Sequence, residues 1–367
     1  MTDKYGIETH KLSYHPQRVV SLINARNNWE LAKKNYPIYV EISPIGACNH
    51  RCSFCAVDYI GYNPVRIDLN ILKPVLKEMA ENGVKSIMYA GEGEPLLHKQ
   101  IAQIAEMTKK NGIDVAFTTN ATVLPKNFLE TALPHTSWLK VSINAGRAET
   151  YSQIHQTKKE DFDKAIKHLT LMVKYKKQHN LNVTLGAQSL LLPENRTEMA
   201  ELIKICRDYI GLDYLVIKPY SQHLFSNTRK YSQIDYQKDL ELKTKLLSMS
   251  NDSFQVVFRE QTMKKHIAGN TQRYSRCHAT PNLWAYIMAD GRVFSCSAYL
   301  LDDRFDLGNI NDQSFTQIWE GSKRMKNFEY INNHLNIEQC RVNCRMDAVN
   351  RYIDAVVEQD IQHINFI

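Results

Sequence analysis

The chain has 367 residues, enough to bury a large core in one domain with an appendage or in two domains. Its 46 Lys and Arg against 39 Asp and Glu leave a formal net charge of +7, which is too mild and too scattered for a nucleic-acid-binding protein, so we expect no nucleic acid as a partner. A polar N-terminus and the absence of 18 consecutive apolar residues argue against a secretory signal and a membrane partner, and we expect a cytoplasmic protein whose thiols stay reduced.

The first half of the chain alternates short apolar runs with amphipathic stretches. Strands are predicted at 38–43, 85–91, 114–120, 138–146, 182–190 and 213–219, and helices at 68–83, 98–112, 126–133, 159–180 and 195–211. Such alternation implies a parallel sheet with right-handed crossovers. We therefore predict the α/β class, a partial (β/α)6 TIM-type barrel whose chemistry lies at the C-terminal ends of the strands.

The alternation ends near residue 225. A polar stretch, a helix at 240–250 and one further strand at 254–260 follow, and residues 283–296 alternate around Asp290-Gly291, which predicts a β-hairpin. We expect a small α+β domain, a β-hairpin plus helix, at the C-terminal end. The predicted organisation is an N-terminal extension at 1–37, the barrel at 38–225, a connecting segment at 226–270, the small domain at 271–350 and a tail at 351–367.

Three cysteines, Cys48, Cys52 and Cys55, follow the first predicted strand at C-x3-C-x2-C spacing. Three thiolates leave a four-iron cluster one ligand short, and an open position is typical of a catalytic site rather than a structural one. A zinc site completed by His50 or by a distant residue is the alternative.

With Phe54 before its last cysteine, this loop resembles the cluster motif of the radical S-adenosylmethionine (radical SAM) superfamily. The resemblance implies a [4Fe-4S] cluster bound by three cysteines plus S-adenosylmethionine (SAM). It also implies reductive cleavage of SAM to a 5'-deoxyadenosyl radical, which abstracts hydrogen from the substrate, and an electron donor such as flavodoxin or ferredoxin.

Later strand ends carry further matches to this superfamily. The segment 91–95 is similar to its Gly-Gly-Glu-Pro motif, with Glu92 in place of the first glycine, and a carboxylate beside exposed carbonyls can accept hydrogen bonds from an ammonium group. The candidate SAM-binding residues are Gly91, Gly93, Glu94, Thr119, Asn120, Ser142, Asn144 and Gln188. Each polar side chain among them could instead serve as a turn or cap residue.

A second cysteine set comprises Cys277, Cys296, Cys340 and Cys344. Its spacing resembles a SPASM domain in the shortened form called a twitch domain, which implies one auxiliary [4Fe-4S] cluster with four cysteine ligands. Four thiolates would also suit zinc. Cys206 lies on an apolar helix stripe, and we expect a core residue.

The residues after the sixth strand are candidates for catalysis. Lys218, Tyr220 and His223 could bind an anionic group or move a proton, and an ordinary connecting loop is the alternative. Further along, Arg259 and Glu260 could contact the substrate or form a surface ion pair, and we favour the ion pair.

The resemblance leaves the substrate open. Only about 37 residues precede the first strand, too few for a typical peptide-recognition module, which favours a small-molecule substrate such as a sugar, cyclitol or nucleotide-linked sugar. Oxidation, epimerisation and rearrangement all remain candidate outcomes. A peptide- or protein-modifying maturase is the alternative, and an RNA-modifying enzyme or a non-enzymatic metal scaffold is less favoured.

Overall fold

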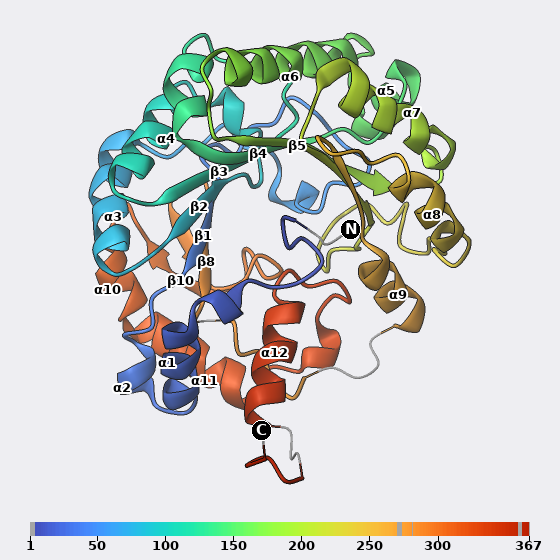
Figure 1. The fold of residues 1–367 in the computed structure, drawn as a ribbon. Coiled ribbons are helices and arrows are strands. Elements are labelled where there is room, and N and C mark those ends of the chain that lie inside the picture. The colour runs from blue at the N-terminus through green and yellow to red at the C-terminus, as the bar shows by residue number, and fades with distance from the viewer. Residues whose placement is uncertain (1–3, 270–273, 281, 359–361, 367) are drawn as a thin grey trace.

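A ten-stranded sheet runs through the computed structural model, which describes residues 4–269, 274–280, 282–358 and 362–366. The strand order is β10-β9-β8-β1-β2-β3-β4-β5-β6-β7, and the sheet curls into an open barrel (Figure 1). The strands are β1 (Tyr39–Ile42), β2 (Ser86–Tyr89), β3 (Asp114–Thr119), β4 (Thr136–Ser142), β5 (Thr184–Leu191), β6 (Tyr214–Pro219), β7 (Gln255–Phe258), β8 (Trp284–Ile287), β9 (Arg292–Phe294) and β10 (Asp306–Asn309). The domain boundary expected near residue 271 lies outside the described residues.

The strands β1 to β6 pair in parallel and in chain order, which confirms the predicted α/β fold. β7 adds a further parallel strand, since Tyr214 to Ile217 pair with Gln255 to Phe258. On the other edge of the barrel sheet β8 pairs in parallel with β1, and it pairs with β9 as the predicted antiparallel hairpin. The hairpin therefore extends the barrel sheet itself.

The helices are α1 (Pro16–Ala25), α2 (Trp29–Ala32), α3 (Leu69–Glu81), α4 (Ile101–Lys110), α5 (Ala148–His155), α6 (Glu160–Gln178), α7 (Met199–Lys204), α8 (Leu242–Leu247), α9 (Glu260–Ala268), α10 (Phe315–Trp319), α11 (Ser322–Asn333) and α12 (Asp347–Val357). The helices from α3 to α8 follow one another around the outside of the barrel, whereas α1, α2, α11 and α12 lie below it in Figure 1. In α3 the buried residues recur at helical spacing, and Asp68 begins the helix by accepting a hydrogen bond from the Asn70 amide at 2.7 Å. Cys206 is fully buried in the main core, as expected. Among the described helices, none combines the length and apolarity needed to cross a bilayer.

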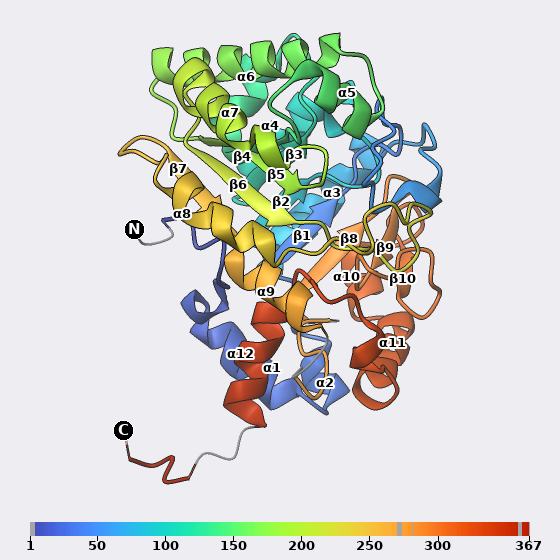
Figure 2. The same ribbon diagram turned by 90° about the vertical axis from the view of Figure 1, so that its right-hand side faces the viewer.

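The N-terminal residues pack against the C-terminal helices (Figure 2). Leu22 of α1 shares a small core with Ile353 of α12. The guanidinium of Arg324 in α11 is fully buried and donates to the carbonyl oxygens of Ala32 at 3.0 Å and Trp319 at 2.8 Å. These contacts tie the first 37 residues to the C-terminal part of the fold.

Candidate active site

The first cysteine loop lies at the C-terminal end of β1. Its thiols, Cys48, Cys52 and Cys55, are all free and half-buried. The loop is anchored to α5 because both the amide and the hydroxyl of Ser53 donate to the carbonyl oxygen of Ile154, at 2.9 and 3.0 Å. The loop is thus positioned at the end of the barrel where the sequence predicted chemistry.

These three thiols suit a cationic cluster. Burial raises the pKa of Cys48 to about 11 and moves the pKa values of Cys52 and Cys55 upward, and neighbouring thiolates add to the shifts of Cys48 and Cys52. Buried thiols this close together can all ionise only beside compensating positive charge, which bound iron supplies. The donor set therefore fits the cluster that the sequence motif implies.

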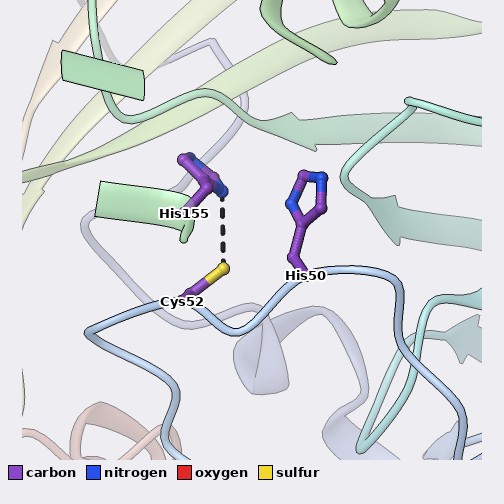
Figure 3. A group of neighbouring side chains, drawn as sticks. All are labelled: His50, Cys52 and His155. Carbon is purple, nitrogen blue, oxygen red and sulfur yellow. Dashed lines mark hydrogen bonds between the residues drawn. The ribbon is translucent and has the colours of Figure 1, made fainter. Parts of the chain in front are cut away.

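Cys52 also faces two histidines, His50 and His155 (Figure 3). The possible ligand atoms of the three residues lie within 4.8 Å of one another, so the zinc alternative has a geometric counterpart. His155 was not identified from the sequence, because it stands at the end of α5, about a hundred residues from the cysteines.

Hydrogen bonds fix the tautomer of His155. The Leu190 amide donates to Oδ1 of Asn144 at 2.6 Å, so Nδ2 of Asn144 points toward Nε2 of His155 at 3.1 Å. Nε2 must then accept, and the proton resides on Nδ1, which lies 3.4 Å from the sulfur of Cys52. His155 is buried, and burial lowers its pKa well below the usual value, so the ring is neutral.

This arrangement disfavours His155 as a metal ligand. Coordination through Nδ1 would move the proton to Nε2, where it would meet the amide hydrogens of Asn144. His155 is instead placed to donate a hydrogen bond to the Cys52 sulfur.

Three candidate residues at the ends of β2 and β3 lie together beside the cysteine loop. The buried carboxylate of Glu94 accepts from the hydroxyl of Thr119 and from the amide of Asn120 at 2.7 Å. The amide of Glu94 donates to the carbonyl oxygen of Ala47 at 2.9 Å. At Gly93 a Cβ would lie 2.1 Å from the carbonyl oxygen of Ile45, so a larger residue would displace the loop.

The other predicted cofactor contacts lie elsewhere. Both amide atoms of Asn144 are used in the His155 network. Gln188 donates to Ser142 Oγ at 2.9 Å and accepts from Lys218 Nζ at 2.9 Å, which forms a polar row across β4, β5 and β6. Gly91 has a φ of +116°, a conformation that glycine tolerates best.

Glu92, the departure from the glycine-rich motif, contacts the hairpin. Its Oε1 accepts from the amide of Ala289 at 2.8 Å. Burial raises the pKa of Glu92 to about 7, while the bond from Ala289 opposes the shift. The end of β2 is thus held against the β8–β9 turn.

Tyr220 and His223 lie after β6, and both are buried. The hydroxyl of Tyr220 donates to Gln222 at 3.2 Å. His223 donates from Nε2 to the carbonyl oxygen of Ser297 at 3.1 Å and accepts at Nδ1 from Phe225, so it joins this loop to the residues after β9. Burial lowers the pKa of His223 to about 4.

The second cysteine set converges from three segments: Cys277 precedes β8, Cys296 follows β9, and Cys340 and Cys344 share the stretch before α12. Burial and then the nearby thiolates of Cys344, Cys277 and Cys340 move the pKa of Cys296 well above its usual value. All four thiols are free. Four sulfur donors with no other ligand type suit an iron–sulfur cluster, and they would also suit zinc.

Arg259 and Glu260 do not pair with each other, so the expected ion pair was wrong. Arg259 pairs with Glu8 at 3.0 Å, and Glu260 pairs with Lys243 at 2.6 Å. Arg259 instead lines a cavity inside the barrel.

Two family models match the chain. Residues 42–206 match the radical SAM superfamily, and residues 277–345 match the SPASM iron–sulfur cluster-binding domain. These matches span both cysteine sets and confirm the two resemblances seen in the sequence. The two domains imply that the protein binds SAM and iron–sulfur clusters.

Curated relatives and solved structures agree with this assignment. A GTP 3',8-cyclase of Chlorobaculum tepidum is 24% identical over 53% of this chain, and the match spans 57% of the cyclase. An AdoMet-dependent heme synthase of Methanosarcina barkeri is 22% identical over 80% of this chain and 85% of its own. Streptococcus suis SuiB, bound to its precursor peptide SuiA, shares the fold with a TM-score of 0.67 at 17% identity, over 89% of this chain and 72% of SuiB. SuiB has also been solved with bound S-adenosylmethionine.

Proposed function

Since this chain is a radical SAM enzyme with a C-terminal SPASM domain, we propose that it reductively cleaves SAM and abstracts hydrogen from a small polar substrate. The substrate class that we favour is a sugar, cyclitol or nucleotide-linked sugar, and its fate is oxidation, epimerisation or rearrangement. The proposed ligands are Cys48, Cys52 and Cys55 for the SAM-binding cluster, and Cys277, Cys296, Cys340 and Cys344 for one auxiliary cluster.

The observation that carries this proposal is the presence of two clusters of free cysteines in one fold, the first after β1 and the second beside the β8–β9 hairpin of the same sheet. When bound, the first cluster and SAM supply hydrogen-abstracting radical chemistry. Around them, Glu94 holds the end of β3 against the cysteine loop, and the Nδ1–H of His155 donates a hydrogen bond to the sulfur of Cys52. Gly93 allows the backbone of β2 to approach that loop closely.

The remaining site residues face the substrate in our proposal. Lys218 and Gln188 line the cavity inside the barrel, while Tyr220 and His223 belong to the loop after β6, which His223 joins to the residues after β9. We assign Lys218 to substrate binding and give Tyr220 and His223 a positioning role, since both ring nitrogens of His223 are bonded within the protein.

A peptide-modifying maturase is the second candidate. It draws support from the fold shared with SuiB, which is bound to a precursor peptide. A small molecule is favoured by the cavity of about 250 Å³ within the barrel, which is below the range typical of drug-sized ligands.

The experiment is an anaerobic assay of the reconstituted full chain with SAM and a reductant. We expect two four-iron clusters per chain and formation of 5'-deoxyadenosine, and its loss in Cys48→Ala and Cys55→Ala. Cys206→Ala is the matched control, because Cys206 is buried in the core away from both sites. Two zinc ions per chain, or cleavage that persists without Cys48, would contradict the assignment.

We also propose the physiological setting. The electron for the first cluster would come from a flavodoxin or ferredoxin in the cytoplasm, where cysteines stay reduced. Reduction of the cluster by either protein, followed spectroscopically, tests this partner.

A further inference from the structure

A cavity of about 250 Å³ occupies the lumen of the barrel. Lys140 from β4 and Lys218 from β6 line it, together with Gln188 of β5, Trp138 of β4, and Arg259, which follows β7. Within each strand, the residues that line the cavity are two or four positions apart, such as Trp138 and Lys140 of β4. This spacing arises because every second side chain of a strand faces the same side of the sheet.

The lumen is rich in positive charge. Burial, followed by the charges of Arg345 and Arg259, lowers the pKa of Lys140 to about 8. Burial and the neighbouring charge of Lys140 also move the pKa of Lys218 well below its usual value. The two lysines thus repel each other in a space that water solvates poorly.

The arginines near this cavity have carboxylate partners, and the lysines do not. Arg259 pairs with Glu8 at 3.0 Å, and Arg345 pairs with Glu41. Within the described part of the chain, neither Lys140 nor Lys218 forms an ion pair. Lys140 Nζ lies 5.4 Å from the centre of the Trp138 ring, and Lys218 Nζ donates to Gln188.

The N-terminal segment forms one wall of the same space. Tyr5 packs on Tyr214 at the start of β6, with ring centres 5.0 Å apart, and Glu8 holds Arg259. The Tyr5 contact lies at the N-terminal end of β6, whereas Lys218 and Arg259 lie at the C-terminal ends of β6 and β7, the end of the barrel at which the cysteine loop leaves β1. A ligand held by the lysines would therefore extend toward the cysteine loop.

We propose that Lys140 and Lys218 together bind an anionic group of the substrate, a phosphate or a carboxylate, inside the barrel. This inference rests on the proposed function and narrows its substrate to an anionic small molecule. The anion would offset the two ammonium charges that have no carboxylate partner among the described residues, and the ammonium groups of β4 and β6 could each donate to it. The substrate's reacting carbon would then lie on the side of the cysteine loop.

The test is isothermal titration of the cluster-loaded full chain, without SAM, using inorganic phosphate, acetate, glucose 6-phosphate and glucose as probes. We expect saturable binding of the anions and none of glucose. Tighter binding of glucose 6-phosphate than of inorganic phosphate would identify a phosphorylated small molecule. Tighter binding of acetate than of either phosphate probe would identify a carboxylate.

Variants assign the binding to the two lysines. Lys140→Met and Lys218→Met should each weaken binding by at least about tenfold, because each removes a charge-assisted hydrogen bond. Lys140→Arg, which keeps the charge, should retain binding. Lys174→Met is the matched control, since Lys174 is exposed on α6 and its loss removes the same charge outside the lumen.

A stability measurement shows whether the variants fold. Lys140→Met should unfold at a higher temperature than the wild type at pH 7, because Lys140 is charged below a pKa of about 8 at a cost to the fold. Anion binding that is unchanged in both methionine variants, or absent from the wild type, would overturn the inference. SAM cleavage measured on the same samples is independent of it, so its failure would overturn only the proposed function.

Discussion

Removal of the hydrogen bond from His155 to Cys52 is expected to make the first cluster harder to reduce. His155→Phe keeps an aromatic ring against Tyr151, whose ring centre lies 4.0 Å away, and deletes the N–H that faces the sulfur at 3.4 Å. A reduced cluster carries more negative charge on its sulfurs, so this N–H stabilises the reduced state more than the oxidised one. The midpoint potential should therefore fall in the variant.

The size of the shift follows from the energy of one hydrogen bond. If the bond favours the reduced state by about 1 kcal/mol, the midpoint falls by about 40 mV, since a tenfold change corresponds to 59 mV for one electron. A potentiometric titration followed by EPR measures the midpoint without any turnover. Asn144→Leu should shift it in the same direction by less, because His155 stays in place but is free to change its tautomer.

His168→Phe provides the control for this experiment. His168 contacts the carbonyl oxygen of Ala121 at 2.7 Å, and among the described residues it forms no hydrogen bond with the cysteine loop. An unchanged midpoint in His155→Phe, in a protein with a full complement of iron, would refute the reasoning. A fall of equal size in the His168 variant would show that the effect is not specific.

Three further outcomes are expected. Cys340→Ala should lack the iron of one cluster and form no product, while some SAM cleavage persists; iron analysis and chromatography measure these outcomes. A full iron content would contradict the role of Cys340 as a ligand. Arg324→Met should lower the free energy of unfolding by about 3 kcal/mol, because buried carbonyl oxygens lose their donor, and a urea midpoint equal to that of the wild type would contradict this. Folding raises the pKa of Glu92 from 4.5 to about 7, so the ionised carboxylate destabilises the wild type at high pH. The free energy of unfolding of Glu92→Gln should therefore increase relative to that of the wild type as pH rises from 5 to 8, by roughly 3 kcal/mol at pH 8. Parallel urea curves for the two proteins across this range would refute the assigned pKa shift.

The parts of the fold that depend on local pattern could be predicted from the sequence. Buried parallel strands and amphipathic helices leave a regular alternation, so β1 to β6 were located within a few residues. The hairpin was also visible, because its turn carries Asp290-Gly291. Its pairing partner was not, since the register of β8 against β1 joins residues about 245 positions apart, such as Tyr39 and Trp284.

In the candidate site, too, local features could be predicted from the sequence, and contacts between distant segments could not. Cysteine spacing identified both sulfur sites, because ligand spacing within a loop is a local property. His155 was missed because only folding brings α5 to the cysteine loop. The pairing of Arg259 with Glu8 spans 251 residues, and Lys140 lies in a strand whose sequence does not indicate that it faces a cavity. Contacts between distant segments leave no pattern in a single sequence.

The parallel pairing of β8 with β1 fixes the spacing of the two redox centres. The first cysteine loop leaves the end of β1, and Cys296 follows the hairpin that begins with β8. Neighbouring strands lie about 4.8 Å apart and cannot slide without breaking their ladder of hydrogen bonds. An electron passing between the two centres would therefore cross a gap that does not vary with domain motion.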